Sequence, residues 1–152
     1  MEIERKYLVA SLPDDLNRYP HVEIEQAYLC TSPTLRIRRM GDVHILTVKE
    51  KISTASSAIH NREEEFILSK DTYNALKSKC NGNSVLKTRY KIPLGDYTAE
   101  LDVFHGVHEG LHLVEVEFPD TNAADTFQPP AWFGVDVSSD PRYRNSYMVF
   151  NG

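Results

Sequence analysis

Ionisable side chains alternate with apolar ones in several short segments of this 152-residue chain. Glu115 and Glu117, for example, are separated by Val116. In a β-strand, residues two apart lie on one face, so each such pair places two like charges side by side. The same spacing recurs in Glu2 and Glu4, Arg36 and Arg38, Glu63 and Glu65, Lys87 and Arg89, and Glu100 and Asp102. Like charges that share a face repel one another unless a ligand or an ion neutralises them, so these pairs are the residues most able to do chemistry.

A single pair of this kind is typical of the solvated outer face of a sheet. Six strands with such faces in one small domain favour another interpretation, in which the charged faces turn inward. If the strands close into a barrel, its interior becomes a charged tunnel, and helices or a second subunit must cover the outward apolar faces. A membrane barrel shares this pattern, but interrupting helices and the lack of a signal peptide disfavour it.

A tunnel of this composition needs two kinds of partner. Clustered Arg and Lys side chains need a polyanion, and phosphoryl oxygens suit both the guanidinium fork and the ammonium group. Clustered carboxylates need hard divalent cations, for which Mg²⁺ or Mn²⁺ is the natural choice. In phosphoryl transfer, positioning and charge neutralisation supply most of the catalysis. The charge pattern therefore predicts metal-dependent chemistry on a small polyphosphate.

The elements that must position these residues are read from period-two alternation and turn signals. No repeat or linker divides the chain, so we expect one domain over residues 1–152. Its predicted class is α+β, mainly antiparallel β, with an eight-stranded closed or nearly closed barrel and a few short covering helices. Strands are predicted near residues 2–9, 22–30, 33–40, 43–51, 62–68, 84–93, 96–104 and 111–119. Helices are predicted over Pro13 to Arg18, Lys70 to Cys80 and Thr121 to Phe127, with Ser69 and Asp120 as N-caps, and Lys51 to Asn61 is expected to be a mobile loop.

Composition narrows the possible partners. The net charge is −5, so the whole chain shows no electrostatic footprint for a nucleic-acid backbone or an anionic membrane. No apolar run approaches membrane-spanning length. Cys30 and Cys80 lack metal-ligand spacing, and we expect both to be reduced thiols. These features predict a cytoplasmic protein.

The N-terminal run Glu2-Ile3-Glu4-Arg5-Lys6 resembles the E-x-E-x-K signature of the CYTH superfamily, the triphosphate tunnel metalloenzymes. Later motifs resemble the family in the same order: Leu35-Arg36-Ile37-Arg38, Leu46-Thr47-Val48-Lys49, Glu63-Glu64-Glu65, Lys87-Thr88-Arg89-Tyr90, Glu100-Leu101-Asp102-Val103-Phe104 and Val114-Glu115-Val116-Glu117-Phe118. The resemblance covers essentially the whole chain and is to the compact bacterial members. It implies an eight-stranded tunnel, often in a homodimer, that hydrolyses inorganic tripolyphosphate to pyrophosphate and phosphate, with nucleoside triphosphates accepted by some members.

The resemblance also implies residue roles. Divalent metal would be held by Glu2, Glu4, Asp102, Glu115 and Glu117. Phosphates would be held by Lys6, Arg36, Arg38, Lys49, Lys87 and Arg89. Glu63, Glu65 and Glu100 would line the tunnel and orient water or a second metal; which carboxylate activates water stays open. Many relatives have an Arg where this chain has Asn61, so either a bulge turns Arg62 inward and shifts Glu63 and Glu65, or one phosphate contact is absent.

Several residues have two interpretations on sequence alone. Tyr28 would either gate the attacking water or pack near a strand end. Arg142 and Arg144 would either cap a tunnel mouth or belong to a solvated tail. Trp132 and Phe133 are expected to pack on the barrel, and the histidines are expected at the surface or in loops. The alternative functions are a class IV-type adenylate cyclase, another organic triphosphatase acting on thiamine triphosphate or nucleotides, or a non-catalytic polyphosphate or nucleotide sensor.

Overall fold

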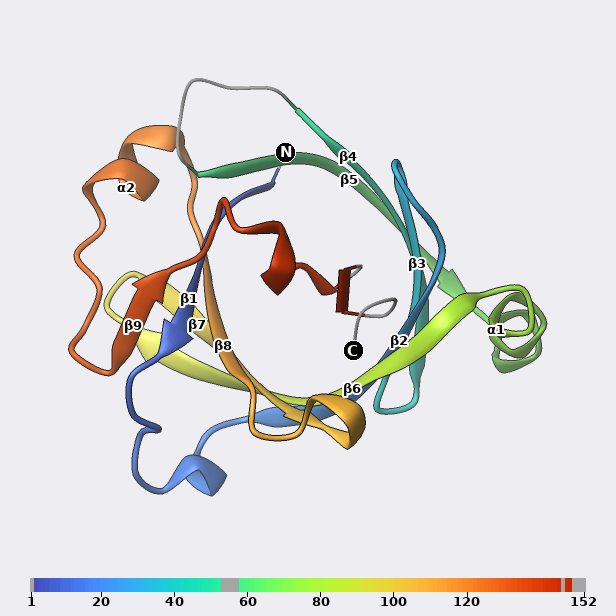
Figure 1. Ribbon diagram of the computed structural model, residues 1–152, viewed down its shortest axis with the longest axis horizontal. Helices are drawn as coiled ribbons and strands as arrows, with labels where there is room; N and C mark the ends of the chain where they lie inside the picture. The colour runs from blue at the N-terminus through green and yellow to red at the C-terminus, as the bar shows by residue number, and fades with distance from the viewer. Residues whose placement is uncertain (1, 53–57, 146, 149–152) are drawn as a thin grey trace.

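The computed structural model describes residues 2–52, 58–145, 147 and 148. Over these residues the chain forms nine strands in one antiparallel sheet, in the order β5-β4-β3-β2-β6-β7-β8-β1-β9, and β5 also pairs with β1. That last pairing closes eight strands into a barrel (Figure 1). The strands are β1 (Glu2–Val9), β2 (His21–Thr31), β3 (Thr34–Met40), β4 (Val43–Lys51), β5 (Ile59–Leu68), β6 (Asn81–Leu94), β7 (Tyr97–His105), β8 (His112–Glu117) and β9 (Phe133–Asp136). The predicted α+β class, the eight barrel strands and their antiparallel order are confirmed.

Two short α-helices lie outside the barrel wall (Figure 1). They are α1 (Lys70–Lys77) and α2 (Thr121–Thr126), with single 3-10 turns at η1 (Leu16–Arg18), η2 (Gly106–His108) and η3 (Pro141–Tyr143). Both predicted N-caps are confirmed: the Ser69 side chain accepts from the Thr72 N–H, and the Asp120 side chain accepts from the Ala123 N–H. The first predicted helix proves to be only the turn η1, and α1 ends before Cys80.

Strand β9 was not predicted from the sequence. It pairs with β1 through Tyr7 and Val9, outside the closed barrel. Gly134 permits this close approach, because a Cβ there would lie 3.1 Å from the Leu8 carbonyl oxygen. The expected packing of Phe133 on the barrel is confirmed, since its ring centroid lies 4.9 Å from that of Tyr7. A four-residue strand offers too little alternation for a pattern to detect.

The predicted loop between β4 and β5 is shorter than expected. Its middle, residues 53–57, lies outside the described residues. Ile59, His60 and Asn61 instead begin β5, where they pair with Glu4, Ile3 and Glu2 of β1. This pairing is the closure of the barrel, a long-range contact that local sequence does not signal. It also makes His60 a buried strand residue, which corrects the expectation of a surface or loop histidine.

Apolar side chains on the outside of the barrel are covered in two places, as the sequence required. Under α2 and β9, the cluster comprises Ile3, Tyr7, Leu101, Val114, Val116, Phe118, Ala124 and Phe133, with further neighbours. Under α1, Tyr73 packs with Ala27 and Ile37. Arg5 lies on this outer face of β1, where its Nε donates to the Ala124 carbonyl oxygen over 2.7 Å. The two clusters hold the barrel wall and leave the opposite face of each strand for the interior.

The barrel interior is not uniformly charged. Tyr28, Val85, Phe104 and Leu113 form an apolar cluster there, joined by Val137 and Met148 of the C-terminal segment. The C-terminal segment, residues 137–145, 147 and 148, lies across the barrel opening that faces the viewer in Figure 1. The expectation of a wholly ionic tunnel is thus corrected: an apolar plug occupies part of the interior. No helix among the described residues is both long and apolar enough to cross a membrane.

Candidate active site

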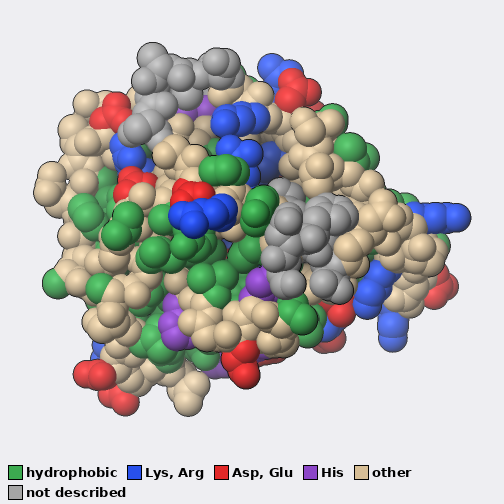
Figure 2. Space-filling model, in the orientation of Figure 1, with side chains coloured by type: hydrophobic (Ala, Val, Ile, Leu, Met, Phe, Trp, Pro, Cys, Tyr) green, Lys and Arg blue, Asp and Glu red, His purple; other side chains and the backbone are tan. Residues whose placement is uncertain are grey.

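A cavity of about 1020 Å³ occupies the barrel interior and is lined by residues from all eight barrel strands and the C-terminal segment. Its ionisable lining residues include Glu2, Glu4, Lys6, Arg36, Arg38, Lys49, Lys51, Glu63, Glu65, Arg89, Lys91, Glu100, Glu115, Glu117 and Arg144. Figure 2 shows basic and acidic side chains side by side in the middle of the face that Figure 1 presents. A concave site of this size is typical of ligand-binding cavities. The structure therefore brings most of the predicted site residues together around one space.

Strand register explains how β1 and β8 place their charges. Glu2, Glu4 and Lys6 alternate with outward residues, so all three face the cavity. Glu117 lies directly opposite Glu4, and Glu115 lies opposite Lys6. The Lys6 ammonium nitrogen lies 3.4 Å from a Glu115 carboxylate oxygen. The pairing thus creates one acid–acid contact and one acid–base contact, two residues apart.

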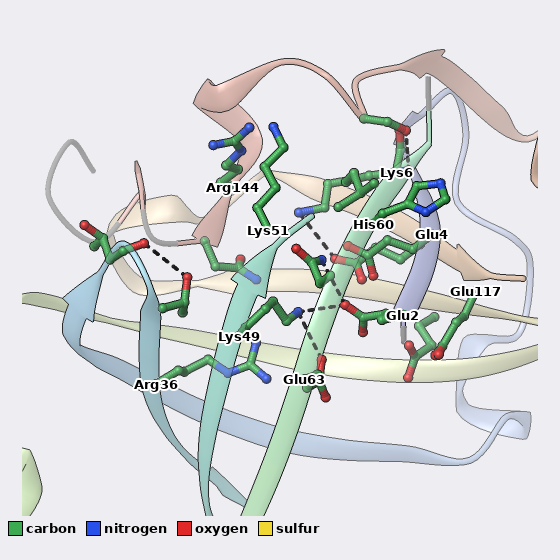
Figure 3. A pocket seen from close by; sticks show the side chains of 18 of the residues that line it. Glu2, Glu4, Lys6, Arg36, Lys49, Lys51, His60, Glu63, Glu117 and Arg144 are labelled. Carbon is green, nitrogen blue, oxygen red and sulfur yellow. Dashed lines mark hydrogen bonds and ion pairs between the residues drawn. The ribbon is translucent and has the colours of Figure 1, made fainter. Parts of the chain in front are cut away.

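Lys49 of β4 connects the first acidic strand to the middle one (Figure 3). Its Nζ lies 3.0 Å from Glu2 Oε1 and 3.3 Å from Glu63 Oε2. Burial lowers the pKa of Lys49 and Arg36 opposes its charge, yet the Glu4, Glu2 and Glu63 carboxylates raise this pKa above the ordinary value. Lys49 is therefore a permanent cation among acids.

Asn61 resolves the ambiguity around Arg62. Asn61 is buried and donates from Nδ2 to Glu2 Oε1 over 3.2 Å, whereas Arg62 is exposed. The register between β4 and β5 runs without a bulge, so Glu63 and Glu65 keep their inward facing. Asn61 was missed as a site residue because it has no charge; its only sequence signal is its place in the alternation with Glu63.

The carboxylates on β1 and β8 disturb one another. Burial raises the pKa of Glu4 well above the ordinary value, and Glu115 and Glu2 raise it further. Burial also raises the pKa of Glu117, again with help from Glu2 and from Glu100. The opposite holds for Glu115: burial raises its pKa, but Lys6 and the neighbouring bases lower it far more. The cavity thus contains excess negative charge around Glu4 and Glu117.

That excess charge fits a divalent cation. A second, smaller cavity of about 440 Å³ is lined, among the described residues, by Glu2, Glu63, Glu65 and Glu117 alone. Carboxylate oxygens are the donors that Mg²⁺ and Mn²⁺ prefer. In the part of the chain that the structure describes, no three acidic, histidine or cysteine side chains stand ready-grouped as a metal site. The donor chemistry of these carboxylates fits such an ion, and Glu2 is held by Lys49 in this structure.

Arg36 and Arg38 supply buried positive charge from β3. The Arg36 guanidinium donates to Thr47 Oγ1 over 3.3 Å, and Arg38 lies 3.8 Å from Glu65. Both Nε atoms are buried and have no hydrogen-bond partner among the described residues. Burial, followed by the charges of Arg36 and Arg89, lowers the pKa of Arg38 to about 10. Buried guanidinium groups with unused donors are suited to binding an anion.

Lys87 and Asp102 lie deeper than predicted. Neither is among the described residues that line the cavity. Asp102 accepts two hydrogen bonds from Arg89, at 2.7 and 2.9 Å, and lies 2.8 Å from Lys87 Nζ. Burial lowers the pKa of Lys87 to about 7, and its Nζ lies 5.5 Å from the Phe104 ring centroid. The structure thus differs from the predicted direct contacts with phosphate and metal, because Asp102 is occupied by Arg89, which itself lines the cavity and approaches Glu100 at 3.5 Å.

Tyr28 and the C-terminal segment complete the wall. Tyr28 lines the cavity, and its hydroxyl accepts a hydrogen bond of 2.9 Å from Gln26, so it is both a packing and a cavity residue. Lys6 Nζ donates to the Tyr143 carbonyl oxygen over 3.0 Å. Arg144 lines the cavity, whereas the Arg142 side chain is 68% exposed and paired with Asp140. Arg144 therefore belongs to the tunnel wall, and Arg142 is a solvated residue of the tail.

Comparison with known proteins agrees with this geometry. Residues 1–128 match the CYTH domain family. The chain is 40% identical to an inorganic triphosphatase of Nitrosomonas europaea, with 99% of this chain and 97% of the relative covered. It is 35% identical to an inorganic triphosphatase of Acetivibrio thermocellus, with 99% and 94% covered. A crystal structure of an inorganic triphosphatase superposes with a TM-score of 0.70 at 38% identity, covering 98% of this chain and 94% of that one. A putative adenylyl cyclase from Hippeastrum shares the fold, with a TM-score of 0.60 at 16% identity and 82% and 83% covered.

The family match spans the barrel strands and ends before β9 and the C-terminal segment. The motifs on β1, β3, β4, β6, β7 and β8 that resemble the CYTH superfamily all fall inside it. Together with the closed barrel and its charged interior, this match settles the family. The chain belongs to the CYTH domain family.

Proposed function

We propose that this protein hydrolyses inorganic tripolyphosphate to pyrophosphate and phosphate, with Mg²⁺ or Mn²⁺ as the required cofactor. The observation that carries the proposal is that one cavity contains both unpaired basic donors and crowded carboxylates. Arg36 and Arg38 offer buried, unused donors to an anion. Glu4 and Glu117 are neighbouring carboxyls with raised pKa values, and a bound cation would stabilise their charged forms. The activity of the two inorganic triphosphatase relatives supports the same substrate.

The phosphates bind to the basic side of the cavity. Arg36, Arg38 and Lys49 provide buried charge from neighbouring strands, and Arg89 and Lys6 provide it from the facing wall. Guanidinium groups bind phosphoryl oxygens through two parallel hydrogen bonds, while ammonium groups act as compact point charges. Lys87 acts one step removed, because with Asp102 it fixes the Arg89 guanidinium.

Divalent metal would be held by Glu2, Glu4 and Glu117, with Glu63, Glu65, Glu100 and Glu115 nearby. A bound Mg²⁺ or Mn²⁺ would neutralise charge on the phosphate chain and lower the pKa of a bound water. The carboxylates that do not bind metal orient the attacking water by accepting its hydrogen bonds. Asp102 is not part of this set, since Arg89 and Lys87 occupy its oxygens.

Lys6 and Tyr28 are the proposed polar groups beside the reacting phosphate. Lys6 Nζ is held by the Tyr143 carbonyl and by Glu115, which leaves a third N–H for a phosphoryl oxygen. Tyr28 accepts from Gln26, so its own O–H is free to donate. Glu63 and Glu65 complete the catalytic set as acceptors for water.

The experiment is phosphate release from tripolyphosphate, ATP, GTP and thiamine triphosphate, each with Mg²⁺, Mn²⁺ or chelator. We expect metal-dependent turnover that is fastest on tripolyphosphate. Glu63→Gln should be compared with Glu64→Gln, because Glu64 is the exposed neighbour on the same strand. Loss of activity in the first variant alone would support the site. No metal-dependent release from tripolyphosphate would refute the proposal, and cyclic AMP formed from ATP would favour the cyclase instead.

Location and assembly form part of the same proposal. Cys30 and Cys80 are both free thiols in the structure, which supports a reducing, cytoplasmic setting. Phe66 and Ile67 of β5 are 50% and 76% exposed, which supports a homodimer with this surface buried. We propose no nucleic-acid or membrane partner, because the net charge of the chain is −5 and several of its bases face the cavity. Sedimentation analysis of the purified protein would test the assembly.

A further inference from the structure

Several bases of the cavity have no carboxylate partner among the described residues. Lys6, Lys49 and Arg89 are each paired with a carboxylate. The side chains of Lys51, Lys91 and Arg144 have neither a hydrogen-bond nor a salt-bridge partner among the described residues, although all three line the cavity. Their positive charges are therefore available to an anion that enters the cavity.

Lys51 and Arg144 reach this cavity from distant parts of the chain. Lys51 ends β4 and continues the inward alternation of Lys49. Arg144 follows η3 in the C-terminal segment, which lies outside the family match. In Figure 3 both charged groups project to one side of the cavity, beside the C-terminal segment, whereas Glu2, Glu63 and Glu117 lie toward the other side. Lys51 and Arg144 thus project away from the part of the cavity where Lys49 pairs with Glu2 and Glu63.

Electrostatics gives this separation a consequence. Charges of one sign at the opening of a low-dielectric cleft focus the field and raise the local concentration of the opposite ion. Glu2 and Glu63 do not pair with Lys51 or Arg144, because Lys49 holds both of these acids. Arg142 shows the contrast, since its guanidinium lies outside the cavity and binds Asp140 at 2.8 Å.

We propose that Lys51 and Arg144 form a second anion site at the mouth of the tunnel, which binds a phosphoryl group beyond the triphosphate held by the buried bases. This inference rests on the proposed function. The shared chemistry is a phosphate dianion held by one guanidinium fork and one ammonium group. It has two possible sources: the fourth phosphate of a longer linear polyphosphate, or orthophosphate released by hydrolysis.

The kinetic test compares Lys51→Gln and Arg144→Gln with Arg142→Gln as the matched control on the same segment. The ratio of KM for tetrapolyphosphate to KM for tripolyphosphate reports on chain extension. The inhibition constant for orthophosphate reports on product binding. Loss of one charged hydrogen bond at a solvent-accessible site should raise the relevant quantity about fivefold. A rise in the first assigns the site to a longer chain, and a rise in the second assigns it to the product.

A binding test separates this inference from the proposed function. Full-length protein is titrated with orthophosphate in a calorimeter, with and without Mg²⁺, at low and high salt. We expect weaker binding in Arg144→Gln than in Arg142→Gln, and a difference that shrinks as salt increases. Equal affinities and equal kinetic ratios in all three variants would overturn the second site. Absence of tripolyphosphate turnover in the unmutated protein would instead overturn the proposed function, whatever the titration shows.

Discussion

Glu4 and Glu117 lie directly opposite each other on β1 and β8, inside the barrel. Burial and neighbouring acids raise the pKa of both carboxyls. Two facing buried acids destabilise the folded protein. Their presence therefore indicates a functional role rather than a role in folding.

The first prediction removes one of these acids. Glu4→Gln should raise the free energy of unfolding of the metal-free protein by about 1 kcal/mol, because a buried charge and its repulsion disappear. The same variant should lose at least about a hundredfold in turnover, since a proposed metal ligand is gone. Urea denaturation in chelator and phosphate release in Mg²⁺ measure the two effects. A variant that is both less stable and fully active would contradict the assignment of Glu4.

The second prediction concerns the pair formed by Lys6 and Glu115. Lys6→Ala should leave the fold intact but cost about 3 kcal/mol of stability, because Glu115 keeps a buried charge without its nearest cation. Turnover should fall at least about a hundredfold, as expected for a group that contacts the reacting phosphate. Circular dichroism checks the fold, and phosphate release checks activity. The double variant Lys6→Ala, Glu115→Gln should recover stability without activity; recovery of both would place Lys6 outside the site.

The third prediction uses Glu25 on the outer face, away from the cavity. Burial raises its pKa, but hydrogen bonds from Lys77 and Tyr73 lower it below the ordinary value. A carboxyl with a lowered folded-state pKa stabilises the protein above its unfolded-state pKa of about 4, and that stabilisation is lost as pH falls further. Glu25→Gln should therefore cost about 1 kcal/mol at pH 7, a modest value because the site is partly exposed. Denaturation of both proteins from pH 7 to pH 3 should show the difference vanish; a constant difference would contradict it.

The fourth prediction tests the C-terminal segment as part of the cavity wall. Met148 is buried with Tyr28, Phe104 and Leu113 inside the barrel. Met148→Ala should destabilise the protein by about 2 kcal/mol through the space it leaves. It should also raise KM for tripolyphosphate, because the segment carries the Tyr143 carbonyl that holds Lys6. Thermal unfolding and steady-state kinetics provide the measurements, and Tyr147, which is 42% exposed, offers Tyr147→Ala as a milder comparison.

The strand pattern determined which side chains face one another. Because side chains alternate strictly along a strand, the pairs Glu2 and Glu4, Arg36 and Arg38, and Glu115 and Glu117 were placed on inward faces without any coordinates. Turn glycines at Gly41 and Gly95 followed in the same way, and both adopt positive φ. The family resemblance then supplied the expected closure and chemistry.

Only the tertiary structure determined how deep each side chain lies in the barrel and which distant segments meet there. Alternation cannot say how deep in the barrel a residue lies. Lys87 was expected at the phosphates and Asp102 at the metal, but both lie behind Arg89, and Lys87 lies against Phe104. The alternation pattern also does not detect a neutral site residue such as Asn61 among charged ones, or a strand as short as β9. Alternation also cannot predict that Arg144 lines the same cavity as Lys51, because the two residues are far apart in sequence and packing of the C-terminal segment brings Arg144 there. The sequence by itself thus determined the faces and the kinds of charge, and the three-dimensional packing decided which of those charges meet.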